Sequence, residues 1–132
     1  MSIQSIVPIV TTTNLRATRA FYVEKLGFQL SFDHDHYLGL RTGPQGSPEI
    51  GFMRPDAEAP EAFNGHGITL ALRVEDADRE HARLMRAGVE IAEPPQDQPW
   101  GARSFVVRDP NGVMIHLSHP IPAAMEFQES IR

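Results

Sequence analysis

The sequence of 132 residues contains no cysteine. This absence excludes disulfide bonds, thiolate catalysis and any metal site built on thiolate ligands. No apolar run approaches the roughly 20 residues that a membrane-spanning helix needs. The N-terminal residues contain no basic stretch followed by a long apolar one, so we expect no signal peptide and a cytoplasmic protein without a membrane partner.

Positive charge is also scarce in this sequence. Twelve Lys and Arg residues face 17 Asp and Glu residues, which gives a net charge of -5 and leaves no basic run. We therefore expect no nucleic-acid partner, because binding to phosphates needs a concentrated positive patch. The acidic balance slightly favours a cationic small molecule instead. The hydrophobic fraction of 41% is sufficient for a folded core.

The sequence does contain an internal repeat. The segments at 41–55 and 108–120 each combine an arginine, a Gly/Pro turn, a short apolar strand and a closing proline. A predicted strand, a helix and a glycine precede each segment, which indicates two copies of one βαβββ unit. Within this single domain we predict module one at about residues 3–55, a linker at about 56–66, module two at about 67–120, and a C-terminal tail at 121–132.

Local patterns support the elements of each module. Asn14 is a good N-cap and Gly27 a good C-terminal stop for a helix at 15–25, and Asp76 or Glu75 and Gly88 serve the second helix in the same way. The alternation of apolar and polar residues at 68–74 is typical of a strand with one buried face. The remaining strands are predicted at 3–12, 28–32, 37–42, 49–53, 89–92, 103–108 and 113–118, with a proline-rich loop at 94–101.

One helix in each unit can cover only one face of its strands. Two such units side by side predict an α+β fold in which a curved mixed sheet has the helices outside and a cleft inside. A small domain of this shape usually binds a small molecule in the cleft.

Two segments of the sequence resemble signatures of the vicinal oxygen chelate superfamily. LRATRAFYVEKLGF at 15–28 is similar to its first-helix signature, and PWGARSFVVRDPNGVMIHL at 99–117 is similar to its second-module signature. The superfamily includes glyoxalase I, bleomycin-resistance proteins, fosfomycin-resistance enzymes, methylmalonyl-CoA epimerase and extradiol dioxygenases. The resemblance covers about residues 5–120 and implies the glyoxalase/bleomycin-resistance fold and a homodimer, but not one reaction.

The resemblance also identifies the positions of possible metal ligands. In metal-dependent members the ligands lie near the start of the first strand and on the last strand of each module, which correspond here to Val7, Gly51, Thr69 and His116. Only His116 is a good ligand, whereas a divalent metal site needs roughly three from His, Asp or Glu. We therefore expect no metal and no other cofactor. Glu49 and His66 are the nearest substitutes, but Glu49 lies two residues from Gly51 and His66 falls in the linker.

The predicted ligand-binding residues lie on the strands and loops that would line the cleft. His116 shares a strand face with Met114, whereas the apolar residues between them would face a helix. Trp100, in the proline-rich loop, would either stack on a flat or cationic ligand or pack the loop onto the core. The full predicted set is Tyr37, Gly51, Met53, Thr69, Trp100, Phe105, Met114 and His116.

The resemblance is closest to the metal-free bleomycin-resistance branch. We therefore predict an antibiotic-resistance type of protein, without catalytic residues, that sequesters an aromatic or cationic molecule in the intermodular cleft. The alternative is a glyoxalase-like lyase, isomerase or dioxygenase that uses Zn, Ni or Fe, with His116 as one ligand. A third hypothesis is metal-free acid–base catalysis by His116, because an imidazole can exchange protons near neutral pH.

Overall fold

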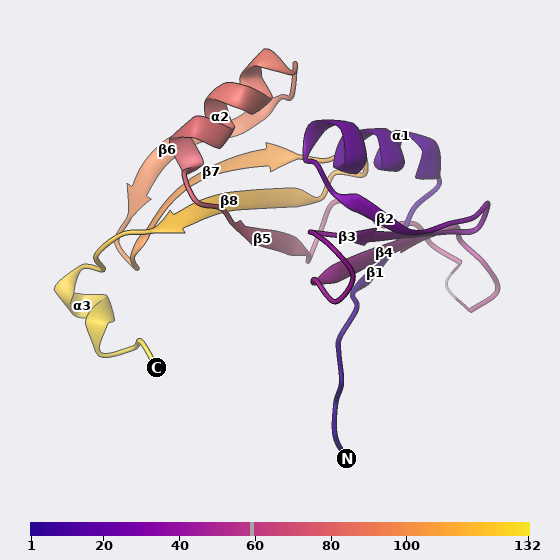
Figure 1. Cartoon of the computed structure of the whole chain (residues 1–132), viewed down its shortest axis with the longest axis horizontal. Coiled ribbons are helices and arrows are strands. Elements are labelled where there is room, and N and C mark those ends of the chain that lie inside the picture. The colour runs from indigo at the N-terminus through magenta and orange to yellow at the C-terminus, as the bar shows by residue number, and fades with distance from the viewer. Residues whose placement is uncertain (59) are drawn as a thin grey trace. The chain divides into compact units, whose positions relative to one another are not determined.

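The computed structural model describes residues 1–58 and 60–132, so part of the linker predicted at 56–66 lies outside the described residues (Figure 1). The chain divides into two compact units. Unit 1 comprises Met1–His66 and Pro110–Gly112, and unit 2 comprises Gly67–Asp109 and Val113–Arg132. Each unit contains one strand, one main helical segment and three further strands, in that order. This arrangement confirms the α+β fold with two βαβββ modules.

Unit 1 consists of a mixed four-stranded sheet and one helical segment. Its strand order is β1-β4-β3-β2, with β1 parallel to β4 and the other pairs antiparallel. The Asn14 side chain accepts a hydrogen bond from the Ala17 backbone N–H at 2.9 Å and so caps the helical segment. Its elements are β1 (Ile9–Thr11), α1 (Leu15–Arg19), the π-helical continuation η1 (Ala20–Lys25), β2 (Gln29–Asp33), β3 (Tyr37–Arg41) and β4 (Glu49–Met53).

The helical segment of unit 1 packs on one face of this sheet only. The Tyr22 ring is fully buried, with its centroid 5.3 Å from that of Phe28 and 5.1 Å from that of Phe52. Along β3 and β4, alternate side chains are buried toward the helix: Leu38, Leu40, Ile50 and Phe52. The side chains between them point to the opposite face, which the helix leaves uncovered.

A turn from late in the sequence completes unit 1. The Asn111 side-chain oxygen accepts a hydrogen bond from the Thr12 hydroxyl, and its amide nitrogen donates to the Thr18 hydroxyl at 3.0 Å. Both threonines are buried, and the Thr18 hydroxyl in turn donates to the Asn14 carbonyl at 2.7 Å. The turn at 110–112, predicted only as a hairpin connection, therefore anchors the start of α1.

Unit 2 repeats the plan of unit 1. Its strand order is β5-β8-β7-β6, with β5 parallel to β8. The α2 N-terminus is capped by the Asp76 side chain, which accepts from the Arg79 N–H at 3.2 Å, and by the His119 Nδ1, which accepts from the Ala77 N–H at 2.8 Å. The elements are β5 (Thr69–Arg73), α2 (Ala77–Arg86), β6 (Ile91–Gln98), β7 (Ala102–Arg108), β8 (Met114–Pro120) and α3 (Met125–Gln128).

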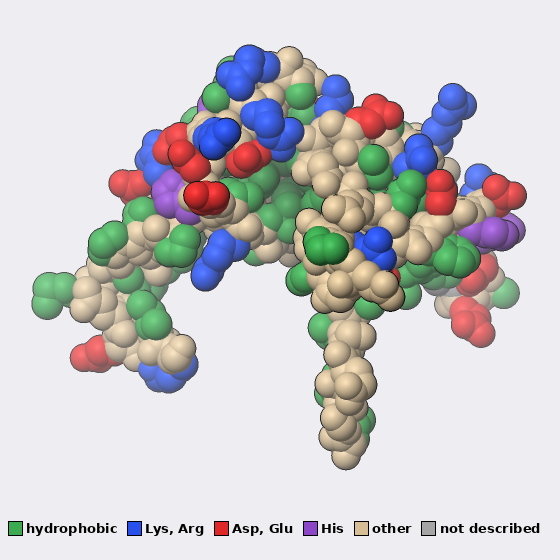
Figure 2. Space-filling view, viewed as in Figure 1, with side chains coloured by type: hydrophobic (Ala, Val, Ile, Leu, Met, Phe, Trp, Pro, Cys, Tyr) green, Lys and Arg blue, Asp and Glu red, His purple; other side chains and the backbone are tan. Residues whose placement is uncertain are grey.

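The core of unit 2 lies between α2 and one face of its sheet. The fully buried Phe105 ring meets the His81 ring of α2 edge-on, with centroids 5.3 Å apart. Leu84, Ile115 and Leu117 are buried with them. The C-terminal segment after β8 is different, since Met125 and Ile131 are 85% and 62% exposed and Figure 2 shows hydrophobic side chains gathered on it.

No helix in the described part of the chain has the length and apolar character that crossing a bilayer requires.

Candidate functional site

The uncovered face of unit 1 carries side chains that the register places in rows across the sheet. Directly paired residues of antiparallel strands project to the same side. One row contains Gln29, Arg41 and Glu49, which are paired across β2, β3 and β4. The next row contains Gly39 and Gly51, and the row after that contains Tyr37 and Met53. The face therefore combines a charged row, a glycine row and a row of larger side chains.

Tyr37 lies over the glycine row. A Cβ atom added to Gly51 would be only 2.0 Å from the Tyr37 hydroxyl oxygen and 2.6 Å from the ring carbon that bears it. Gly51 is therefore buried by the Tyr37 side chain. A residue with any side chain at position 51 would force the tyrosine ring to move.

The environment of Tyr37 is partly apolar and partly acidic. The Tyr37 ring lies edge-on to Phe32, with centroids 5.9 Å apart. Burial raises the pKa of the Tyr37 phenol above 10, and the negative charge of Glu49 raises it further. The phenol therefore keeps its proton at neutral pH and can donate a hydrogen bond, while Glu49 can attract a cation.

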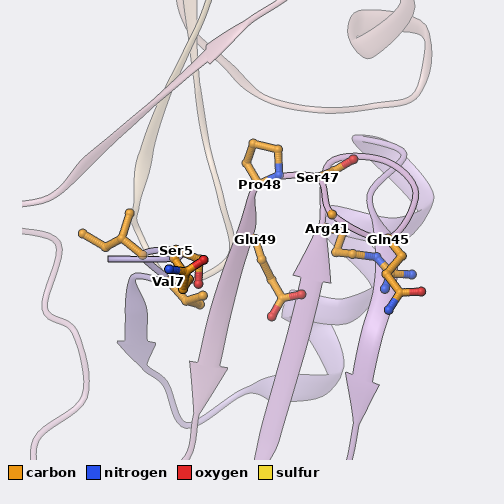
Figure 3. Close-up of a pocket in the computed structure, with 10 residues that line it drawn as sticks. Ser5, Val7, Arg41, Gln45, Ser47, Pro48 and Glu49 are labelled. Carbon is orange, nitrogen blue, oxygen red and sulfur yellow. The ribbon is translucent and has the colours of Figure 1, made fainter. Parts of the chain in front are cut away.

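A pocket of about 620 Å³ opens at the charged end of this face (Figure 3). Arg41, Gln45 and Ser47 lie together at the β3–β4 turn, while Ser5 and Val7 of the N-terminal segment lie on the other side of Glu49. Gln4, Ile6, Gly46 and Pro48 complete the lining. The volume falls within the roughly 300–1,000 Å³ that is typical of small-molecule sites.

Two buried polar atoms of unit 1 have no hydrogen-bond partner among the described residues: the Arg41 Nε and the Ser31 hydroxyl oxygen. The terminal Arg41 nitrogen Nη2 donates weakly to the Leu30 carbonyl at 3.4 Å. Ser31 belongs to the uncovered face too, because its hydroxyl oxygen lies 2.4 Å from where a Gly39 Cβ would project. Incomplete pairing of a buried polar group costs free energy, so both atoms would gain from a hydrogen-bond partner.

Unit 2 also has an uncovered face, on the side of its sheet opposite α2. His116 is paired with Val106 of β7 and with Ala71 of β5, while Met114 is paired with Thr69. His116, Met114 and Thr69 therefore share one face, as their strand positions predict. Their role in ligand binding stays a prediction.

Of the predicted site residues Phe105 and Trp100, the structure buries the first and exposes the second. Phe105 is fully buried under α2 and paired with Leu117, so it lies on the opposite face from His116. This corrects the prediction that Phe105 is one of the residues lining the ligand-binding cleft. Trp100 lies in the turn between β6 and β7 and is 54% exposed, so it does not pack the loop onto the core.

The equivalent positions on β4 and β8 offer one metal-ligating side chain, that of His116. Ile9 is paired with Gly51 in unit 1, and Ala71 with His116 in unit 2, so the register makes Gly51 and His116 equivalent. At position 51 there is no donor atom, and the Tyr37 side chain fills the space where one would project. Among residues 1–58 and 60–132, no group of three or more His, Asp or Glu side chains could hold a metal ion.

None of the eight residues in the predicted ligand-binding set lines the pocket at the β3–β4 turn. Tyr37, Gly51 and Met53 of that set share the sheet face of Arg41 and Glu49, whereas the predicted set does not include Arg41, Gln45 or Ser47. The hairpin register was the available signal, because pairing the two strands across the turn places Arg41 opposite Glu49.

Comparison with known proteins identifies the family. The sequence profile of the Glyoxalase/Bleomycin resistance protein/Dioxygenase superfamily matches residues 2–117. The chain therefore belongs to this superfamily. Uncharacterized proteins of Mycobacterium bovis and Mycobacterium tuberculosis are 36% identical to it over 62 residues, or 47% of this chain, but the match covers only 41% and 36% of their respective lengths.

Solved structures show the same fold. A glyoxalase/bleomycin resistance protein/dioxygenase from Nocardioides superposes with a TM-score of 0.76 at 23% identity, over 92% of this chain and 85% of that one. TnmS3, an antibiotic binding protein from Streptomyces sp. CB03234, superposes with a TM-score of 0.74 at 30% identity, over 91% of this chain and 98% of that one. TioX from Micromonospora sp. ML1 superposes with a TM-score of 0.69 at 24% identity, over 90% of this chain and the whole of that one.

Proposed function

We propose that this protein binds a small aromatic or cationic molecule and sequesters it without chemical change, as in the metal-free bleomycin-resistance branch of its superfamily. One observation carries the proposal. The uncovered face of unit 1 presents the Tyr37 ring and the Glu49 carboxylate beside a pocket of about 620 Å³. The similarity to TnmS3, an antibiotic binding protein, supports the same proposal.

The chemistry of the face suits such a ligand. An aromatic ring can stack on Tyr37, and a cationic group can be attracted by Glu49. A cation–π contact contributes about 0.5–2 kcal/mol, whereas a micromolar dissociation constant needs about 8 kcal/mol. The remainder must come from desolvation of the ligand and from polar contacts with Arg41, Gln45 and Ser47. We also propose that His116, Met114 and Thr69 contribute to binding from unit 2.

The proposal extends to the surroundings of the protein. We propose a homodimer in the cytoplasm, with the small molecule as its other partner and with neither metal nor nucleic acid. The family resemblance supports the dimer, and the net charge of -5 supports the lack of a nucleic-acid partner.

Calorimetry with a panel of cationic aromatic dyes and their neutral analogues tests the proposal. We expect saturable binding of at least one cationic dye, weakened about tenfold by Tyr37→Ala and by Glu49→Gln, because each removes one contact of the ligand. Glu90→Gln, which removes an equal charge at an exposed position outside the face, should leave affinity unchanged. Mass spectrometry should recover the dye unaltered.

Two results would contradict the proposal. One is the absence of saturable binding across the panel. The other is stoichiometric Zn, Ni or Fe in the purified protein by elemental analysis, because metal would then supply the Lewis-acid chemistry of the alternative enzyme class.

A further inference from the structure

A second pocket of unit 1, of about 210 Å³, lies on the helix side of the sheet. We call it the arginine pocket. It is formed by the start of α1, the β2–β3 turn and the residue that follows β4, and its lining includes Leu15, Arg16, Arg19, His34, Leu38 and Arg54. Leu38 and Tyr37 are neighbours on β3 and project to opposite faces of the sheet. The arginine pocket is therefore separate from the face on which the proposed function rests.

Backbone and ion-pair contacts hold the walls of this pocket in place. The Arg19 Nε donates to the Asp33 carboxylate at 3.1 Å, which joins α1 to β2. The His34 N–H donates to the Tyr37 carbonyl at 3.0 Å and closes the turn. The Arg54 N–H donates to the His36 carbonyl at 3.0 Å, which holds the backbone of Arg54 against the β2–β3 turn. The walls are thus positioned without using the guanidinium groups of Arg16 and Arg54.

The pocket lining contains more arginine side chains than carboxylates. Arg19 is paired with Asp33, while the side chains of Arg16 and Arg54 form no ion pair with any residue that the structure describes. Asp35 is the second carboxylate in the lining, so three arginines face two aspartates.

The imidazole of His34 adds a further donor. Its Nδ1 accepts from the His36 backbone N–H at 3.4 Å, which leaves Nε2 available to a ligand. The excess of arginines over aspartates makes the pocket locally positive, whereas the whole chain has a net charge of -5.

We propose that the arginine pocket binds a small organic anion, either a carboxylate or a phosphate monoester. Arg16 and Arg54 would hold the anionic group, because guanidinium groups form paired hydrogen bonds with carboxylate and phosphate oxygens. The half-buried Leu15 offers an apolar surface for the rest of the molecule. The volume equals that of roughly seven water molecules at about 30 Å³ each, which suits a compact anion.

Titration with phenyl phosphate, benzoate and the neutral benzyl alcohol tests this proposal, with binding followed by calorimetry and by the NMR signals of arginine side chains. We expect at least one anion to bind and benzyl alcohol not to bind. The double variant R16Q/R54Q should weaken anion binding about tenfold or more. The matched control R79Q/R86Q removes the same charge from exposed positions of α2 and should change affinity less than about twofold.

The relative affinities identify the ligand class. Tighter binding of phenyl phosphate assigns the pocket to phosphate monoesters, and tighter binding of benzoate assigns it to carboxylates. Failure of both anions to bind, or equal weakening in the two double variants with circular dichroism unchanged, would overturn the proposal. The Tyr37→Ala variant should bind the anion as the original protein does. The test of the arginine pocket is therefore independent of the test of the proposed function.

Discussion

At the scale of single residues, the contact between Tyr37 and Gly51 has the clearest energetic consequence. We expect Gly51→Ala to lower the free energy of unfolding by about 1–3 kcal/mol, because the added methyl group overlaps the tyrosine hydroxyl and ring. Urea denaturation of the variant measures this loss.

The double variant provides the control for this residue pair. In a Tyr37→Ala background the same glycine substitution should cost less than about 1 kcal/mol, since the obstructing ring is gone. Equal costs in the two backgrounds would show that the ring does not occupy the space above the glycine.

Tyr37 should also titrate abnormally. Burial and the Glu49 carboxylate both raise its pKa above 10. A raised pKa in the folded protein means that the contribution to stability is complete below pH 10 and is lost as the pH rises through the folded pKa. Ultraviolet absorbance of the phenolate against pH measures it, and Glu49→Gln should move the midpoint downward. A midpoint at or below 10 would contradict the described environment.

At the scale of elements, the Asn111 side chain connects the 110–112 turn to the start of α1. Asn111→Ala should cost about 1–3 kcal/mol, because the buried hydroxyl groups of Thr12 and Thr18 each lose a hydrogen-bond partner. The control is Asn64→Ala, since Asn64 is exposed and its side chain accepts from the neighbouring His66 backbone N–H at 3.2 Å. Thermal unfolding of the two variants should differ clearly; similar melting temperatures would argue against the anchor.

Elements with local signals could be predicted from the sequence. The helix expected at 15–25 coincides with α1 and η1, because its cap at Asn14 and its stop at Gly27 are both local features. The sequence predicts the first strand at 3–12, but the strand β1 comprises Ile9–Thr11, since its partner β4 is short and Pro8 has no N–H to donate. Strand β6 runs on to Gln98 through two prolines, which an edge strand tolerates.

The side of the sheet that Phe105 faces could not be predicted in the same way. Residues 104–107 are all buried, so burial does not alternate along β7 and does not show which of its side chains face α2. Only pairing with Leu117 fixes the direction of the ring. The pocket residues Gln45 and Ser47 escaped prediction for a related reason, because a turn sequence shows that the chain reverses but not what lines the space beside it.

At the scale of the whole molecule, membership of the superfamily sets the architecture and leaves the ligand open. The proposed homodimer gives one test at this scale. Light scattering during size-exclusion chromatography should give a mass twice the 14.7 kDa of the chain. A mass of one chain across the micromolar concentration range would contradict the dimer and leave the binding proposal to be judged on unit 1 alone.

At one pair of neighbouring positions, the two units place the large and the small side chain on opposite strands. By register, Tyr37 and Gly51 of unit 1 correspond to Ser104 and His116 of unit 2. The residues at positions 37 and 51 therefore constrain each other, because a larger side chain at 51 costs least where the aromatic ring at 37 has moved or is absent.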